Sequence, residues 1–255
     1  MRTGDEYLRS LNDGRRVFVD GELIKDVTTH PAFRQAARSI ATLYDIAAQP
    51  DLRERMTFTS PKTGAPVHRA WQIPKDHAGL RARRLFSETW AEATFGLMGR
   101  APDHVAGFFS GYAANPKFFA SAGQQQFADN LVAFYEFMRD NYIYCSYAIV
   151  PPQIDRSKPA HKQSDPTLYA GVVKERDDGI VISGAQQLAT GGAISDELHP
   201  AARARRRELR QLSRRADLGG GFEALSPASL CRRWPRRRLS TVEPVRRIRQ
   251  LRHFR

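Results

Sequence analysis

The 255-residue sequence has little cysteine, with Cys145 and Cys231 far apart in the chain. Two such residues exclude a disulfide framework and a cysteine-rich metal cluster. The histidines show no metal-ligand spacing either, so we expect no metal site. Long apolar runs are also missing, since no stretch approaches the roughly 18 apolar residues of a membrane span. The polar N-terminus has no apolar signal core, and we therefore expect a cytoplasmic protein with no membrane partner.

Lysine is absent from residues 200–255, which contain 17 arginines and four acidic residues and thus carry the whole net charge of +13. Residues 1–199 are neutral overall, so the folded body has no basic character. Arginine without lysine fits a GC-rich gene read in a shifted frame, and we interpret 200–255 as a frameshifted, disordered tail. The alternative is an arginine-rich tail that binds nucleic acid. The absence of lysine and of repeats disfavours that alternative.

Apolar periodicity predicts a mainly helical first part of the chain. Asp20-Gly21, between two short alternating segments of 17–27, predicts a hairpin. Residues 56–75 are rich in Pro, Gly, Ser and Thr and predict a long loop. Helices are predicted over about 31–47 with Pro31 at the first position, over about 77–98, from Pro102 onward, and over about 124–140.

The pattern changes after residue 140. Residues 142–150 form an apolar run that fits either a buried strand or the tail of a helix. Asp178-Gly179 lies between two alternating segments and predicts a second hairpin. The order of elements predicts an α+β fold, with a helical domain over 1–140, the beginning of an incomplete β domain over 141–199, and the tail over 200–255.

Five segments occur in the order and spacing of a known family: RTGDEYLRSLNDGR, DVTTHPAFR, WAEATFGLMGRAPDHVAGFFSGY, AIVPPQIDRSK and GIVISGAQQLATGGAISDELH. Over residues 1–199 the chain resembles the N-terminal part of the 4-hydroxyphenylacetate 3-monooxygenase family of flavin-dependent phenol hydroxylases. We find no resemblance after His199.

The resemblance implies an acyl-CoA dehydrogenase-like architecture with N-terminal helices, a middle β-barrel and a C-terminal helical bundle that forms a homotetramer. It also implies a two-component reaction, in which a separate NAD(P)H:flavin reductase supplies FADH2. Oxygen then forms a flavin C4a-hydroperoxide, and one oxygen atom is transferred to a phenol ring ortho to its hydroxyl. A chain without the rest of the barrel and the bundle is expected to be truncated, weakly active or inactive, and not to form the tetramer.

The resemblance also assigns three candidate catalytic residues. Arg100 matches the substrate-pocket arginine, which would draw the phenol toward phenolate. His104 falls where many members carry an aromatic residue, and a histidine there could act as acid or base. Tyr147 falls where the best-known members have a histidine. Because a tyrosine ordinarily has a pKa of about 10, it can hydrogen-bond there but not serve as a base near pH 7. We expect the substrate to be 4-hydroxyphenylacetate or, because of the tyrosine at this position, a related phenol such as another phenolic acid or a chlorinated phenol.

Two segments match FAD contacts of the family. The first is PPQIDR, with Gln153, Ile154, Asp155 and Arg156. The second contains Thr190, followed by Gly191 and Gly192, which allow a close approach of the backbone. No GxGxxG or GxxxxGK[ST] motif is present, which excludes a Rossmann or P-loop reading. A dehydratase on the same fold would need an iron–sulfur cluster, and the single cysteine before residue 200 argues against it.

Overall fold

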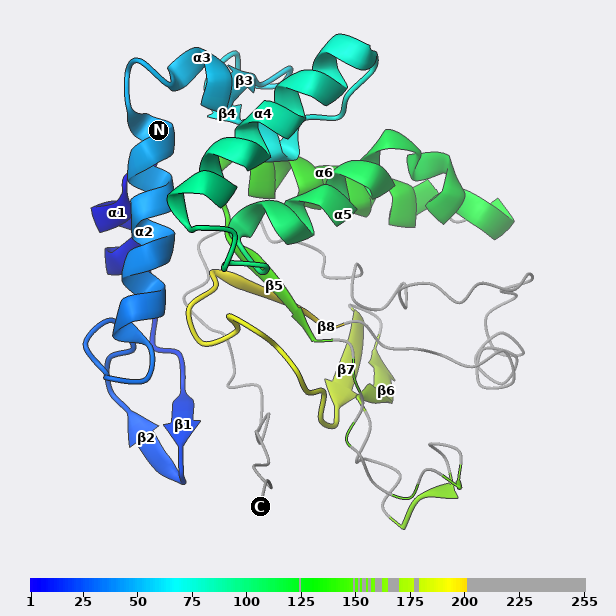
Figure 1. Ribbon diagram of the computed structural model, residues 1–255. Helices are drawn as coiled ribbons and strands as arrows, with labels where there is room; N and C mark the ends of the chain where they lie inside the picture. The colour runs from blue at the N-terminus through cyan, green and yellow to red at the C-terminus, as the bar shows by residue number, and fades with distance from the viewer. Residues whose placement is uncertain are drawn as a thin grey trace. The chain divides into compact units, whose positions relative to one another are not determined.

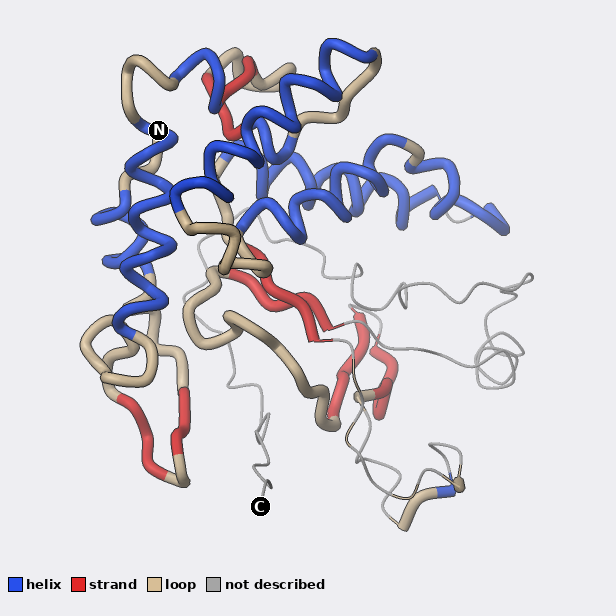
Figure 2. Tube along the Cα trace, in the orientation of Figure 1, coloured by secondary structure: helices blue, strands red, loops and turns tan. Residues whose placement is uncertain are grey.

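Figures 1 and 2 show the computed structural model of the chain, which describes residues 1–123, 125–148, 150, 152, 155, 157–158, 162–164, 170–176 and 179–200. Two compact units are present. The first consists of Met1–Pro116, Leu131–Ser146 and Thr190–Leu198, and the second of Lys117–Asn130, Tyr147–Ala189 and His199–Arg255. The tail from residue 201 lies outside the described residues, so its frameshifted origin, its disorder and the nucleic-acid alternative stay predictions. The domain boundaries at 140 and 199 also stay predictions.

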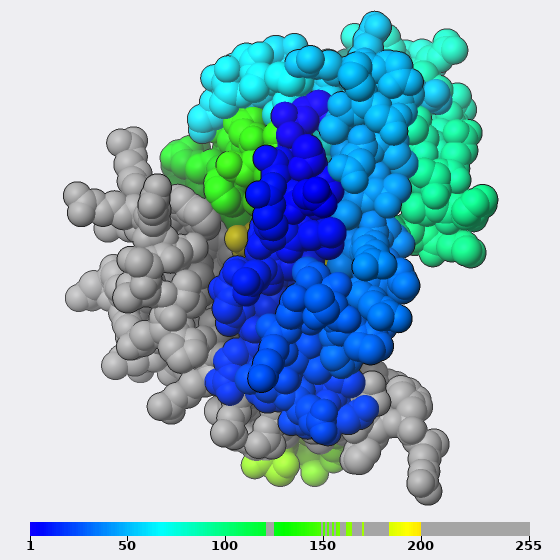
Figure 3. Space-filling view, turned by 90° about the vertical axis from the view of Figure 1, so that its left-hand side faces the viewer, coloured from blue at the N-terminus to red at the C-terminus, as the bar shows by residue number. Residues whose placement is uncertain are grey.

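The chain begins with α1 (Gly4–Ser10), which packs against α2 (Arg34–Ala48). Figure 3 shows the N-terminal segment, in dark blue, lying along α2 in lighter blue. Helix α1 starts with a capping box, in which the Thr3 side chain accepts from the Glu6 amide and the Glu6 carboxylate accepts from the Thr3 amide. Gly4 permits the close approach of the two helices, because a Cβ there would overlap the carbonyl of Ala41. Sequence periodicity did not reveal α1, which is two turns long.

The first predicted hairpin is confirmed as β1 (Val17–Val19) paired with β2 (Glu22–Ile24). Asp20 and Gly21 both have positive φ, as a tight two-residue turn requires. The helix predicted from Pro31 begins instead at Arg34. The His30 ring accepts from the amide of Ala32 and its carbonyl accepts from that of Phe33, so these residues form a turn before the helix.

The prediction of a long loop over 56–75 was wrong, because this segment contains a hairpin that was not predicted. After α3 (Arg53–Met56), β3 (Thr57–Thr59) pairs with β4 (Pro66–His68), and the 3-10 helix η1 (Arg69–Trp71) follows. Strands of three residues are too short to show a period of two in the sequence.

Helix α4 (His77–Ala93) ends several residues before the predicted position near 98. Phe95 and Gly96 both adopt positive φ, and the Gly96 amide donates to the Ala91 carbonyl, which closes the helix in a left-handed turn. Within α4, Phe86 and Trp90 are buried and Leu80 is exposed, and Leu97, beyond the end of the helix, is exposed as well.

The next two helices are α5 (Pro102–Ala114) and α6 (Gln125–Asp140), separated by η2 (Pro116–Gly123). Both helices confirm the sequence prediction, and Pro102 occupies the first turn of α5, where its missing N–H costs no bond. The core of the first unit contains these large side chains, all less than 2 % exposed: Trp71, Trp90, Tyr7, Tyr44, Phe86, Phe109, Ile40, Leu43, Met56, Leu131, Met138 and Val67.

The described residues after Asp140 form mainly strands and loops. The apolar run after residue 140 contains β5 (Cys145–Ala148), which forms a two-stranded sheet with β8 (Glu197–Pro200). The predicted second hairpin is confirmed as β6 (Gly171–Arg176) paired with β7 (Gly179–Ser183). In the described residues every α-helix ends by Asp140, and the strands β5 to β8 follow them, as expected for the α+β class, while the complete barrel stays a prediction. Within the described part of the chain, no helix combines the length and apolar character needed to cross a membrane.

His68, at the end of β4, is a buried histidine enclosed by aromatic rings. The ring centroids of Tyr142, Tyr44, Trp90 and Phe86 lie 4.9, 5.4, 5.6 and 6.2 Å from that of the imidazole. Its Nε2 atom has no hydrogen-bond partner, and only 2 % of the residue is exposed. Burial lowers the pKa of His68 to about 3, since a charge there would lose its hydration.

This burial predicts an acid-linked loss of stability. An unfolded His68 takes up a proton near pH 6.5, whereas the folded chain resists protonation until about pH 3. Its stabilising contribution is thus complete above pH 6.5 and lost as the pH falls toward 3, by up to about 1.4 kcal/mol per pH unit. We expect His68→Leu to remove this component of the slope in urea unfolding measured from pH 7 to pH 4. The exposed control His77→Gln should retain it, and equal slopes for wild type and His68→Leu would contradict the prediction.

Candidate functional site

The structure brings Arg100 and His104 together at the start of α5. Arg100 is exposed in the loop before the helix, and His104 lies in the first turn, where its amide donates to the Ala101 carbonyl. The guanidinium Nη1 atom lies 2.9 Å from Nε2 of the imidazole. Because a guanidinium only donates, Nε2 accepts and the ring proton resides on Nδ1. The two predicted catalytic residues of the first unit therefore form a cation–base pair at the surface.

The surroundings keep His104 neutral near pH 7. Partial burial and the neighbouring Arg100 charge both lower the pKa of the imidazole, and Asp103 opposes them only in part. The ring of Phe108 meets the imidazole edge-on, with 4.9 Å between centroids. A neutral imidazole beside a fixed cation can receive a proton from an acidic ligand.

Tyr144 connects this pair to the turn that carries Thr190. Its hydroxyl donates to the Arg100 carbonyl at 2.9 Å, and its side chain is buried. On the other side lies Gly191, with a φ of +80°, where a Cβ would overlap the Tyr144 hydroxyl. Thr190 itself is exposed, and the Ile194 amide closes the turn by donating to the Gly191 carbonyl at 2.9 Å. Arg100 and the Thr190 turn are thus joined through one tyrosine.

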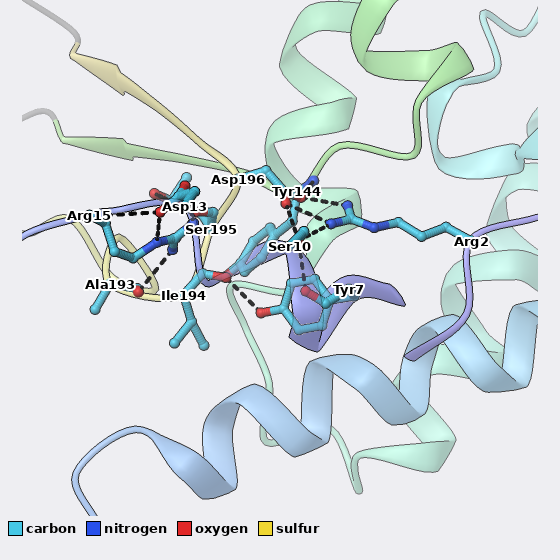
Figure 4. A network of polar contacts seen from close by, with 11 residues as sticks. Arg2, Tyr7, Ser10, Asp13, Arg15, Tyr144, Ala193, Ile194, Ser195 and Asp196 are labelled. Atoms are coloured by element: carbon cyan, nitrogen blue, oxygen red, sulfur yellow. Dashed lines mark hydrogen bonds and ion pairs between the residues drawn. The ribbon is translucent and has the colours of Figure 1, made fainter. Parts of the chain in front are cut away.

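An ion pair between Arg2 and Asp196 holds this turn to the N-terminus (Figure 4). The two guanidinium nitrogens Nη1 and Nη2 each donate to one carboxylate oxygen at 2.7 Å, a bidentate geometry. The guanidinium also lies over the rings of Tyr7 and Tyr44, with its carbon 5.3 and 5.2 Å from their centroids. Ser10 donates to Asp196 at 3.1 Å.

Three successive carbonyls of the same turn accept from the N-terminal segment, those of Ala193, Ile194 and Ser195. Arg15 donates to the first and third at 3.0 and 2.9 Å, and the Tyr7 hydroxyl donates to the second at 2.6 Å (Figure 4). None of these supporting residues was predicted to be functional from the sequence. The one feature of the sequence that could have pointed to them is their place in RTGDEYLRSLNDGR and GGAISDELH, which belong to the segments that carry the family resemblance.

The other predicted site residues belong to the second unit. Tyr147 is half-buried in β5. Asp155 accepts from the amide and the hydroxyl of Ser157 and forms an ion pair with Lys158 at 2.9 Å; the hydrogen bonds from Ser157 and the Lys158 charge lower its pKa. The Gln163 side chain donates to the Asp155 carbonyl at 2.7 Å, which fixes the local backbone. The predictions for Gln153, Ile154 and Arg156 lie outside the described residues.

The Thr190 turn has the chemistry that a flat, polar cofactor ring requires. Thr190 offers an exposed hydroxyl, and Gly191 and Gly192 place no side chain over the backbone. The bonds from the N-terminal segment fix the turn through its later residues and leave Thr190 exposed. These residues fit a flavin. Among the described residues, no group of three or more His, Cys, Asp or Glu side chains is arranged to hold a metal ion.

The fold of this chain matches part of a solved oxygenase component. A crystal structure of the oxygenase component (HpaB) of 4-hydroxyphenylacetate 3-monooxygenase complexed with FAD matches with a TM-score of 0.72 and 34% identity, over 80% of this chain and 42% of that one. A 4-hydroxybutyryl-CoA dehydratase from N. maritimus matches with a TM-score of 0.66 and 23% identity, which shows the fold alone.

The sequence model described as "4-hydroxyphenylacetate 3-hydroxylase N terminal" matches residues 3–209, and the chain belongs to this family. The match ends at residue 209, beyond His199, where we had expected the resemblance to stop. The oxygenase component of 4-hydroxyphenylacetate 3-monooxygenase of Klebsiella oxytoca is 41% identical over 194 residues, 76% of this chain and 36% of its own length. The oxygenase component of 4-nitrophenol 2-monooxygenase of Rhodococcus sp is 38% identical over 76% of this chain and 36% of its own length. The chain thus spans little more than a third of these curated relatives.

The Arg2–Asp196 pair predicts a large and specific stability effect. The two side chains are only 12% and 11% exposed, so Asp196→Asn leaves a buried cation without its counter-charge. We expect this change to lower the free energy of unfolding by about 3 kcal/mol. The measurement is urea unfolding at pH 7.

A matched control is available in the Lys62–Glu136 pair, whose side chains are 55% and 27% exposed. Glu136→Gln should cost less than about 1 kcal/mol, since water screens that pair. Similar losses for Asp196→Asn and Glu136→Gln would show that the first pair is not a buried anchor.

Proposed function

We propose that this chain is the N-terminal part of the oxygenase component of a two-component, FADH2-dependent aromatic hydroxylase. The reaction adds one oxygen atom to a phenol, ortho to its hydroxyl. The main support is the Arg100–His104 pair, which Tyr144 joins to the Thr190 turn. Relatives named as 4-hydroxyphenylacetate, 4-nitrophenol and FADH(2)-dependent monooxygenases also support it.

Arg100 is proposed to bind the phenol oxygen and to favour its ionised form. An electrophilic oxygen donor attacks an electron-rich ring, and a phenolate is more electron-rich than a phenol. A fixed cation within about 4–6 Å lowers the pKa of such a group by about 1–3 units. A phenol oxygen that replaced the direct Arg100–His104 hydrogen bond would meet a cation on one side and the freed Nε2 of a neutral base on the other.

His104 is proposed to accept the phenol proton. Its lowered pKa keeps it unprotonated at pH 7, and its Nε2 atom points to the nitrogen that would bind the same phenol oxygen. Tyr147 is proposed to hydrogen-bond the substrate hydroxyl without taking its proton. This division gives the acid–base role to His104 rather than to the position of Tyr147.

Thr190 and the segment Gln153–Arg156 are proposed to hold the flavin. Thr190 would contact the ring through its hydroxyl and backbone, and Gly191 leaves that backbone open. Asp155 would hold its loop through Ser157 and Lys158. Reduced FAD, when bound, supplies the activated oxygen, while the residues of the chain bind, orient and exclude water.

The proposed partners are a phenolic substrate, O2 and a separate NAD(P)H:flavin reductase that delivers FADH2. The substrate is 4-hydroxyphenylacetate or a related phenol. A barrel completed after β8, a homotetramer and a location in the cytoplasm are further proposals, which rest on membership of the family. Because the chain spans little more than a third of its relatives, binding of flavin and phenol is the property to test first.

The phenolate role of Arg100 can be measured with 4-nitrophenol, whose ionised form absorbs at longer wavelength. We expect the bound ligand to have a pKa at least about one unit lower than in solution, and Arg100→Gln to abolish this difference. The measurement is an absorbance titration of the bound ligand from pH 5 to pH 9. The control Arg84→Gln removes an exposed arginine that pairs with Glu88 and should change nothing. An unchanged ionised fraction in Arg100→Gln would refute the role of Arg100.

The flavin role of Thr190 predicts a weaker cofactor complex in Thr190→Val. Loss of one hydrogen bond to a bound ring should raise the dissociation constant of reduced FAD about five- to tenfold. Anaerobic fluorescence titration measures it. Thr59→Val, at an exposed position of β3, is the matched control and should bind as wild type does. Equal affinities of Thr190→Val and Thr59→Val would remove Thr190 from the flavin site.

A further inference from the structure

Tyr144 is a buried side chain with functional neighbours at its hydroxyl end. The hydroxyl donates to the Arg100 carbonyl at 2.9 Å, and the residue is 2% exposed. It lies one residue before β5. Its hydroxyl therefore acts on the backbone that carries Arg100.

The other end of Tyr144 is anchored by Asp196. The Tyr144 amide donates to the Asp196 carboxylate at 2.8 Å, and the Tyr144 carbonyl accepts from the amides of Asp196 and Glu197 at 2.8 and 3.1 Å. Burial raises the pKa of Tyr144 to about 12, so its hydroxyl keeps the proton that it donates. The ring is thus held in place from behind while its hydroxyl points to Arg100.

Gly191 shows how closely the flavin turn approaches the same hydroxyl. A Cβ at this position would overlap the hydroxyl oxygen of Tyr144 and lie 3.2 Å from the ring carbon that carries it. The glycine is therefore required by the tyrosine as well as by its positive φ. One oxygen atom touches both the Arg100 loop and the Gly191 turn.

On the basis of the proposed function, we propose that Tyr144 is a positioning residue that sets the separation between Arg100 and the Thr190–Gly192 turn. It thereby fixes the phenol-binding cation relative to the flavin. Its hydroxyl holds the Arg100 backbone on one side and limits the approach of the turn on the other. Tyr144 contacts neither ligand itself.

The first test compares Tyr144→Phe with Tyr135→Phe. Tyr135 is the matched control, because it is a buried tyrosine whose hydroxyl donates to the Trp71 carbonyl instead of the Arg100 carbonyl. Hydrogen exchange is followed at the amides of Ile194 and His104, which close the turn and begin α5. We expect protection at both amides to fall about tenfold in Tyr144→Phe and to stay within about twofold in Tyr135→Phe.

The second test is a double-mutant cycle between Tyr144 and Gly191, read as the midpoint of urea unfolding. Gly191→Ala forces a methyl group against the hydroxyl, and Tyr144→Phe removes that oxygen. We expect Gly191→Ala to lower the midpoint less in the Tyr144→Phe background than in wild type. The positive φ of residue 191 remains strained in both backgrounds, so the difference isolates the contact.

The third measurement is the dissociation constant of reduced FAD. We expect it to rise about five- to tenfold in Tyr144→Phe and to stay unchanged in Tyr135→Phe. Additive losses in the cycle, or equal exchange and FAD affinity in the two tyrosine variants, would overturn the positioning role. If the wild-type chain binds no FAD, the proposed function fails, while exchange and the cycle still decide whether Tyr144 positions the two loops.

Discussion

The ion pair between Arg2 and Asp196 is the interaction on which the site depends. It joins residues 194 positions apart in the sequence, and removing two charges from water opposes it. Bidentate geometry, the Ser10 hydroxyl and the faces of Tyr7 and Tyr44 offset that cost. The net contribution of such a pair to stability is therefore small, whereas removing one partner is costly because the other charge stays buried.

The ion pair is connected to the proposed site through the carboxylate of Asp196. Asp196 binds Arg2 through its two oxygens and also accepts from the Tyr144 amide. The same carboxylate therefore holds both the N-terminal segment and the residue that precedes β5. The hydroxyl of Tyr144 in turn contacts the Arg100 backbone and lies against Gly191. Binding sites need supporting residues that lock the ones touching ligand. Here the support comes from Arg2, α1 and Arg15, an N-terminal segment that bears no predicted site residue.

The sequence predicted what depends on neighbours in the chain. Asp20-Gly21 sets its own turn, and Pro102 begins its own helix. Contacts such as that between Arg2 and Asp196 were not predictable, because the sequence around either residue carries no information on which distant residue it contacts. The end of α4 was missed for a related reason: Leu97 extends the apolar period, but positive φ at the preceding glycine stops the helix. The family resemblance, not periodicity, assigned Arg100, His104 and Thr190.

His68 and His104 show why the size of a pKa shift does not by itself locate a functional site. His68 has the larger shift, to about 3, yet it is 2% exposed and enclosed by four aromatic rings. A side chain this buried is not accessible to a ligand. Its neutral form packs in the core, and its protonation in acid lowers the stability of the fold. His104 is shifted less, but it is half-buried beside a cation at the surface. The proposed role of His104 as a base requires such access and a charged neighbour, whereas His68 is buried and only packs in the core.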